Sequence, residues 1–239
     1  MANPPTIVGY TWDKAKAILR AETGNGYSEE MECVLKAALS DTTRIPSLKL
    51  KTNPIELQEY IQKWVEAYHR GYTNRPSVKR GKPSSTHPDV IIKILLEARL
   101  PDLSSTSAEE IVKGHSVLMS LENLVGDLLE EYLSERLKPF GWYCAWGSTI
   151  DAVDFCNKKG ELLQVKNSDN SENSSSSRVR SGTKINKWSR RKSSKADRFS
   201  WDTLQEMTGA DNLSEEDFRT FAVSVIKTNP DCIYIADSE

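Results

Sequence analysis

The sequence predicts an α+β (α/β) fold, in which a mainly helical region over residues 1–110 precedes a region of helices and strands over residues 111–239. Apolar residues recur at helical spacing through much of the first hundred positions, and again from residue 121 to residue 133. From residue 142 the pattern changes to short apolar runs separated by Lys-Lys-Gly and serine-rich segments, which is typical of strands joined by turns.

Three helices are expected in the first region. Residues 27–41 combine a cap at Ser28 with apolar positions at helical spacing. Residues 53–72 place Asn53 as a cap, a proline in the first turn and an apolar face after it. Residues 89–100 are short and mostly apolar, which favours a buried helix and leaves a strand as the alternative.

The second region is expected to begin with a long amphipathic helix from about residue 107, because seven apolar residues between 121 and 133 form one stripe. Pro139 and Gly141 end it. A strand over residues 142–156, a Lys-Lys-Gly turn and a strand over residues 161–167 follow as a β-hairpin. A helix capped at Ser214 and a short strand over residues 232–237 close the chain.

Composition excludes several classes of protein. Hydrophobic residues make up 38% and charged residues 28%, as in an ordinary globular protein, and no run approaches the roughly 20 apolar residues of a membrane span. The N-terminal residues lack a basic stretch followed by an apolar run, so no secretion signal is expected. Three scattered histidines argue against a histidine-built zinc site, and four separated cysteines favour reduced thiols in a cytoplasmic protein.

The predicted hairpin holds the residues best suited to chemistry. Period-2 alternation places Gln164 and Lys166 on one face of their strand, and Asp154 lies roughly opposite Leu163 and Gln164 across the turn. Phosphodiester hydrolysis needs a hard cation on the phosphate, a group that helps to activate water, and a positive charge for the developing anion. Mg²⁺ prefers oxygen ligands and takes only one or two carboxylates, which these side chains can supply. The alternative is a solvated hairpin without a site.

Asp154 followed by Gln164-Val165-Lys166 resembles the PD-(D/E)xK nuclease signature, in the variant in which glutamine replaces the second acid. In that superfamily a helix precedes the hairpin, as residues 121–133 do here. The stretch QVKNSDNSENSSSSRVRSGTKINKW further resembles SinI-like type II restriction endonucleases. The resemblance implies a restriction-endonuclease-like core, with a central mixed β-sheet flanked by helices.

The resemblance also implies an activity: Mg²⁺-dependent, sequence-specific hydrolysis of double-stranded DNA that leaves 5′-phosphates, at GGWCC, where W is A or T. Asp154 would hold the metal with Gln164 adding an amide oxygen, and Lys166 would orient or activate the attacking water. A symmetric DNA site implies a homodimer. Restriction also implies a companion DNA methyltransferase in the host, though not as a bound subunit.

The chain departs from the common signature in two places. Val153 stands where proline usually precedes the aspartate, and Gln164 carries no charge, which makes a nearby acid more important. Glu122 flanks the apolar stripe of the preceding helix and is the acid expected to assist, whereas Glu130 lies nearly opposite the stripe. Asp151 is the rival of Asp154, and their spacing of three allows only one of them to join Gln164 and Lys166.

A basic segment follows the hairpin, with nine lysines and arginines between residues 178 and 198 against the single acid Asp197. Such a patch attracts phosphates, while arginine and asparagine can read base edges. The alternative is a flexible solvated linker, which Trp188 and Trp201 oppose. The residues expected to contact DNA are Asn167, Asn170, Asn173, Ser174, Ser175, Arg178, Arg180, Lys184, Lys187, Arg190 and Arg191.

Other readings remain open from the sequence alone. The chain can be a DNA-binding module that keeps the nuclease fold without cutting, or a structure-specific nuclease of DNA repair or recombination. A basic loop over residues 73–88 can add a second phosphate contact, although a plain solvated loop is the favoured reading there.

Overall fold

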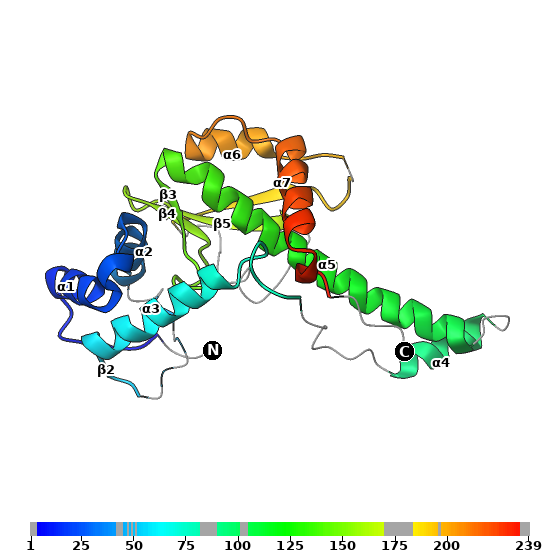
Figure 1. Cartoon of the computed structure of the whole chain (residues 1–239), viewed down its shortest axis with the longest axis horizontal. Coiled ribbons are helices and arrows are strands. Elements are labelled where there is room, and N and C mark those ends of the chain that lie inside the picture. Colours follow the sequence, from blue (N-terminus) through cyan, green and yellow to red (C-terminus); the bar gives the residue numbers. More distant parts are fainter. Residues whose placement is uncertain are drawn as a thin grey trace.

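A computed structural model shows helices arranged around a four-stranded mixed β-sheet, with a two-stranded parallel sheet beside the N-terminal helices (Figure 1). The predicted α+β class is therefore confirmed. The structure describes residues 4–41, 45–46, 48, 50, 52–81, 90–100, 105–169, 184–195 and 197–234. None of the helices within these ranges combines the length and the apolarity needed to cross a membrane.

The N-terminal region consists of α1 (Trp12–Thr23), α2 (Glu29–Ser40) and α3 (Leu57–Thr73). The Ser28 cap of α2 is confirmed, because its hydroxyl accepts a hydrogen bond from the Met31 N–H at 3.2 Å. The Asn53 cap is wrong. The Asn53 amide oxygen instead accepts from the Thr6 N–H at 2.8 Å, and β2 (Ile55–Glu56) pairs in parallel with β1 (Ile7–Val8) before α3 begins.

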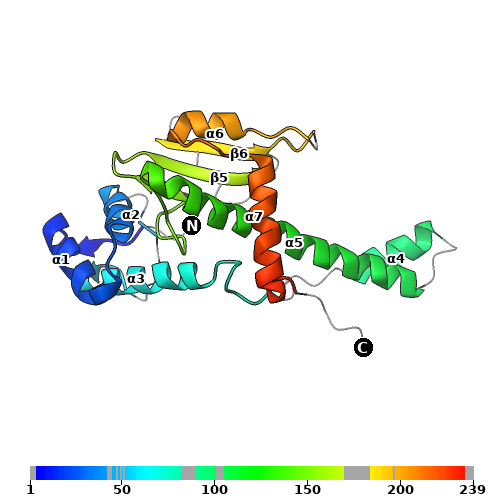
Figure 2. The same cartoon turned by 45° about the horizontal axis from the view of Figure 1, so that its top comes forward.

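Helices α4 (Val90–Arg99) and α5 (Ser105–Leu137) form a hairpin that projects from the rest of the molecule (Figures 1 and 2). The two helices pack against each other, and the C-terminal half of α5 continues along the sheet, where α7 (Glu215–Thr228) crosses it. The prediction of a helix over residues 89–100 is confirmed, but its predicted burial is wrong, because Ile91, Ile94 and Leu95 are exposed.

The central sheet has the strand order β3 (Trp142–Cys144), β4 (Phe155–Asn157), β5 (Leu162–Ser168) and β6 (Ile185–Arg191). The first two pairings are antiparallel and the last is parallel. The single strand predicted over residues 142–156 is wrong, because a loop separates β3 from β4. Positive φ angles at Gly147, Ser148 and Ala152 take the backbone out of the extended region.

The basic segment forms ordered structure wherever the structure describes it. Strand β6 carries its second part, and the buried Trp188 indole donates to the Ser200 carbonyl at 2.8 Å. The linker reading is therefore wrong for residues 184–191. Helix α6 (Trp201–Thr208) follows, and the predicted Ser214 cap of α7 is confirmed. Pro230–Cys232 forms a 3₁₀ turn at the start of the strand predicted over residues 232–237, and residues 235–237 lie outside the described part.

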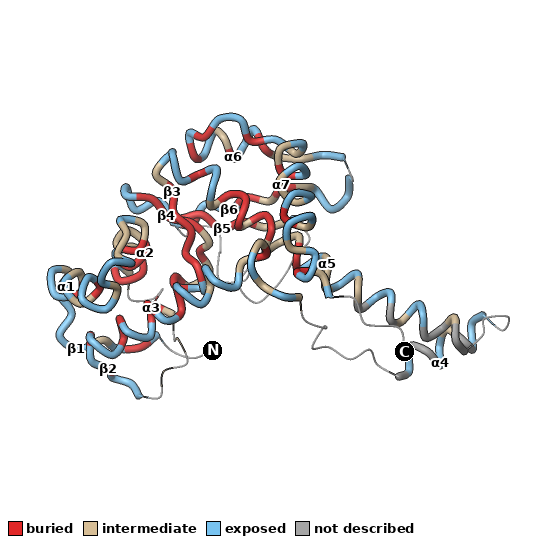
Figure 3. Tube along the Cα trace, in the orientation of Figure 1, coloured by how far each residue is buried: buried red, intermediate tan, exposed pale blue. Residues whose placement is uncertain are grey.

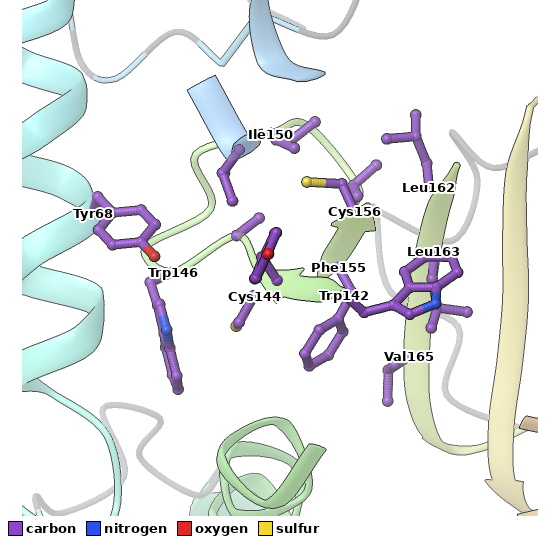
Figure 4. Close-up of a cluster of buried hydrophobic side chains, with 14 of the residues drawn as sticks. Tyr68, Trp142, Cys144, Trp146, Ile150, Phe155, Cys156, Leu162, Leu163 and Val165 are labelled. Carbon is purple, nitrogen blue, oxygen red and sulfur yellow. The ribbon is translucent and has the colours of Figure 1, made fainter. Parts of the chain in front are cut away.

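One hydrophobic core joins the N-terminal helices to the sheet. It extends from Leu35 and Trp64 to Tyr132, Phe155 and Trp188, and it appears as the buried centre of Figure 3. Figure 4 shows how the side chains of the sheet strands gather there together with those from α3 and the β3–β4 loop. The division into regions 1–110 and 111–239 stays a prediction.

Helix α3 meets the β3–β4 loop backbone to backbone, and this contact predicts a large effect of a small substitution. A Cβ added at Gly71 would lie 2.1 Å from the Gly147 nitrogen. We expect Gly71→Ala to lower the free energy of unfolding by about 1–3 kcal/mol, because the helix and the loop must separate. Gly126→Ala, on α5, is the matched control: its new methyl meets nothing within 4 Å. Equal denaturation midpoints for the two variants would contradict this packing.

Candidate active site

The β4–β5 hairpin holds Asp154 beside β5. Asp154 immediately precedes Phe155, the first residue of β4, which pairs with Leu163. The Asp154 N–H donates to the Leu163 carbonyl at 3.0 Å, and the Asp154 carbonyl accepts from Ala145 at 2.8 Å. These backbone bonds hold the aspartate immediately before β4, next to β5.

The Asp154 carboxylate is partly buried and held in place by the neighbouring strand. Its Oδ2 accepts a hydrogen bond from the Val165 N–H at 2.7 Å. Burial raises the pKa of Asp154 to about 6, against the opposing effects of this N–H and of the Lys166 charge. A buried carboxylate is unfavourable without a positive charge beside it, so a bound cation would stabilise the charged form of Asp154.

The Gln164 amide is buried, with 2% of the residue exposed, and it is oriented by one hydrogen bond. Its Nε2 donates to the Ala152 carbonyl at 3.2 Å, whereas its Oε1 has no partner among the described residues. A buried carbonyl oxygen without a partner costs about 1–3 kcal/mol of stability. A ligand that this oxygen can bind, such as a hard cation, would remove that cost.

Lys166 lies two residues further along β5, partly buried. Burial lowers the pKa of its ammonium, Lys187 lowers it further, and the charges of Asp154 and Glu130 oppose both effects. The structure therefore brings Asp154 into the electrostatic environment of Lys166.

The acid that the structure places beside Asp154 is Glu130, and not the predicted Glu122. Glu130 lies in the part of α5 that packs along β5. Burial raises the pKa of Glu130 well above its usual value, and the charges of Asp154 and Asp127 raise it further. Glu122 is exposed, about two turns before Glu130 on the same helix.

Sequence reasoning missed Glu130 because it assumed a single buried face of α5. In the C-terminal half of the helix a second side is also covered, by the loop after α3. Glu131 is 2% exposed, accepts from the Ser77 N–H at 3.0 Å, and pairs with Arg75 at 3.2 Å. An acid outside the apolar stripe can therefore be buried in this part of α5. The feature of the sequence that could have indicated this is the group of three acids at Asp127, Glu130 and Glu131.

The basic loop after α3 is engaged with α5 as far as the structure describes it. Arg75 pairs with Glu131, and Lys79 pairs with Asp127. The Asn229 amide donates to the carbonyls of Pro76 and Lys79, at 2.9 and 2.8 Å. The loop thus covers the helix, and Lys79 adds positive charge near Glu130.

The donor set fits a hard cation held by few protein ligands. No cluster of three histidine, cysteine or acidic side chains able to hold a metal occurs within the described ranges. The donors proposed for a cation are the carboxylates of Asp154 and Glu130 and the Gln164 oxygen, which has no partner among the described residues. All three offer oxygen, which suits Mg²⁺, a cation that keeps several waters and binds one or two carboxylates.

The residues expected to contact DNA fall into four groups. Lys184 is exposed immediately before β6, and Lys187 is exposed on β6, where it pairs in register with Gln164 of β5. Arg191 is partly buried at the end of β6. The remaining expected contacts outside the described part are Asn170, Asn173, Ser174, Ser175, Arg178 and Arg180.

Arg190 and Asn167 are engaged within the protein. Arg190 is buried, and its guanidinium binds both Glu215 oxygens at 2.7 and 2.8 Å and the Asn167 amide oxygen at 2.9 Å. Its guanidinium also stacks over Phe218, 5.0 Å from the ring centre. These contacts tie β5 and β6 to α7, so the Arg190 guanidinium is engaged within the protein.

A family model described as the SinI restriction endonuclease matches residues 15–227, which is most of the chain. The chain belongs to the SinI restriction endonuclease family. It is 39% identical over 181 residues to the type II restriction enzyme Eco47I of Escherichia coli, covering 74% of this chain and 76% of that enzyme. It is 41% identical over 154 residues to the type II restriction enzyme SinI of Salmonella infantis, covering 62% and 66% respectively.

Membership of the SinI family makes the chain a type II restriction endonuclease, a site-specific deoxyribonuclease that acts on double-stranded DNA. The family match includes the hairpin, α5, α6 and nearly all of α7. The sequence resemblance to this family is therefore confirmed. The roles of individual residues stay predictions, with the geometry above as their basis.

The raised pKa of Asp154 predicts how the SinI-family enzyme responds to pH without a metal. The folded protein holds this proton more tightly than the unfolded chain, so the stabilisation is present below about pH 4 and is lost as pH rises through about 6. At about 1.4 kcal/mol per tenfold change in proton affinity, the loss approaches 3 kcal/mol. In EDTA, the unfolding free energy of Asp154→Asn should therefore rise by about 2–3 kcal/mol relative to that of the unsubstituted protein between pH 4.5 and 7. A pH-independent difference in unfolding free energy would contradict the burial of this charge.

Proposed function

We propose that this SinI-family enzyme hydrolyses DNA with Mg²⁺ at a PD-(D/E)xK-type site formed by Asp154, Gln164, Lys166 and Glu130. The observation that supports it most is the buried Gln164 Oε1, which has no partner in the described part of the chain, together with the raised pKa of the Asp154 carboxyl in the same hairpin. Asp154 is tied to the strand that carries Gln164, because its N–H donates to the Leu163 carbonyl and its Oδ2 accepts from the Val165 N–H.

In this proposal each side chain has a distinct task. Asp154 Oδ1, Glu130 and Gln164 Oε1 hold the cation, while the Val165 N–H keeps the other Asp154 oxygen in place. Bound Mg²⁺ would neutralise charge on the scissile phosphate and make water easier to deprotonate. Lys166, whose pKa is lowered by burial, orients the attacking water, accepts or shares its proton and offsets charge on the phosphate. In-line attack leaves a 5′-phosphate and a 3′-hydroxyl.

The proposed recognition sequence is GGWCC, and its support is the family resemblance of the segment after β5. Because this sequence is symmetric apart from its central pair, two copies of the enzyme are expected to meet it as a homodimer. A host that carries the enzyme is expected to carry a methyltransferase that protects the same sequence. Lys184, immediately before β6, and Lys187, on β6, are the described residues that we assign to DNA phosphates.

A digest of a long DNA of known sequence tests the proposal. Discrete fragments in Mg²⁺ that disappear in EDTA are the expected result, and their lengths should map to GGWCC. Fragments at another sequence would overturn the recognition site alone. A smear would indicate nonspecific cutting, and undiminished cleavage in EDTA would overturn the cation's role.

Glu130 is proposed in place of Glu122 as the assisting acid, and a matched pair of variants on α5 separates them. We expect Glu130→Gln to lower the cleavage rate about 100-fold, because it removes one carboxylate from the cation. Glu122→Gln should change the rate less than about twofold, since this side chain is exposed. The assay measures initial rates at saturating Mg²⁺ and then across a Mg²⁺ titration. A large loss of rate in Glu122→Gln with little loss in Glu130→Gln would instead assign the role to Glu122.

A further inference from the structure

The projecting hairpin of α4 and the N-terminal half of α5, residues 90–123, is called the arm below. None of its described residues is buried, and Figure 3 shows no buried segment along it until α5 reaches the sheet. Its two helices pack against each other. The arm is therefore a helical hairpin whose described residues are all exposed or half-buried.

Apolar side chains concentrate on these outer faces. Seven of the fifteen large apolar residues that are exposed in the described part of the chain belong to the arm. Ile91, Ile94 and Leu95 follow helical spacing on α4, and Ile111 and Leu118 lie seven residues apart on one face of α5 with exposed fractions of 48% and 53%. Exposed apolar residues concentrated on one part of a globular protein mark an interaction site.

The charge of the arm decides between DNA and protein as its partner. Within residues 90–123 three basic residues stand against five acids, at Glu97, Asp102, Glu109, Glu110 and Glu122. DNA binding depends on neutralising phosphates with an excess of lysine and arginine, which the arm lacks. Its apolar stripes instead suit the desolvated centre of a protein interface.

The proposed function supplies the reason for a second copy of the chain. One chain offers one candidate site among its described residues, whereas a double-strand break requires two cuts. Leu118 precedes Glu130 by about 18 Å along the α5 axis, so a partner on the arm leaves the site open to a duplex. Since α5 is continuous, arm-to-arm contact would also fix how the two sites face each other.

We propose that two copies of this enzyme pair through their arms, with Ile94 and Leu95 of α4 and Leu118 of α5 at the centre of the interface. The proposal rests on the proposed function for the choice of a second copy as partner. A two-fold interface repeats each contact, so one chain's substitutions count twice. Two lysines introduced per chain would bring four charges into an apolar contact.

Sedimentation velocity of the full chain without DNA or metal tests this proposal. The unsubstituted protein should sediment as a dimer at micromolar concentration. Ile94→Lys with Leu118→Lys should weaken dimerisation at least about 100-fold and leave the helical circular dichroism unchanged, because both positions are exposed. Val223→Lys, at a 52% exposed residue of α7, is the matched control and should remain dimeric.

Other outcomes overturn the proposal. These are a monomeric unsubstituted protein at tens of micromolar, a dimeric arm variant, or loss of the dimer in Val223→Lys. Asp154→Asn separates this proposal from the proposed function, because it should stay dimeric while losing cleavage. On supercoiled plasmid the arm variant should accumulate nicked circles before linear DNA. A normal dimer that cuts nothing would refute the function and leave the interface standing.

Discussion

Asp154→Asn is expected to reduce DNA cleavage by about 10⁴-fold or more while leaving DNA binding in EDTA nearly unchanged. The substitution keeps the shape of the side chain and an oxygen for the Val165 N–H bond. It removes the carboxylate charge that, in the proposed site, lies closest to Gln164 and holds the cation. Single-turnover cleavage rates and gel retardation measure the two effects separately.

Asp151→Asn is the control for this experiment, because Asp151 lies three residues earlier in the loop before β4. The rate of this variant should fall no more than a few-fold. If Asp151→Asn were inactive and Asp154→Asn active, the metal site would have to be rebuilt around the β3–β4 loop.

Lys166→Ala is expected to lower the cleavage rate by about 10³-fold, the range in which one proton-transfer group contributes. DNA affinity should drop only slightly, since the proposed phosphate contacts remain at Lys184 and at Lys187 of the neighbouring strand. The rate of the unsubstituted enzyme should rise with pH as Lys166 and Asp154 lose protons, and the part due to Lys166 should vanish in the variant. Both measurements use the same DNA in single turnover.

Lys187→Ala is the matched control for Lys166→Ala. Lys187 lies on β6 opposite Gln164 and is exposed. The Lys187→Ala variant should bind DNA more weakly, and its affinity should depend less on salt. Its cleavage rate at saturating DNA should stay nearly unchanged. If Lys166→Ala cleaved DNA at the full rate, Lys166 would have only a structural role. An unsubstituted enzyme that binds DNA but does not cut would favour the binding-module reading.

The helices were predictable where one face is apolar and the other is exposed. Residues 57–73 show this most clearly, because Tyr60, Ile61 and Trp64 recur at helical spacing and are all buried. The start of α3 was not predictable, since Asn53 bonds to Thr6, 47 positions earlier. The break between β3 and β4 also escaped prediction, because Ser148 and Ala152 adopt positive φ without a residue type that favours it.

The candidate site was predictable to the extent that it depends on local spacing. A hairpin register follows from the turn, so the approach of Asp154 to Gln164 could be anticipated from the positions of the residues. Glu130 could not, because its proximity depends on how α5 packs between the sheet and the loop at Ser77. Arg190 was expected at DNA for its charge, but Glu215, 25 residues later, binds it.

The parallel pairing of β5 with β6 has a consequence for how such an enzyme changes specificity. Gln164 and Lys166 on β5 share a ladder with Lys187 and Ser189 on β6. Trp188 and Arg190 alternate with Lys187 and Ser189 along β6 and are buried, so they hold that ladder in place from the other face of the sheet. Under the proposed roles, Lys187 can therefore be exchanged during evolution without shifting Gln164 and Lys166, so the DNA sequence that is bound can change while the chemistry is kept.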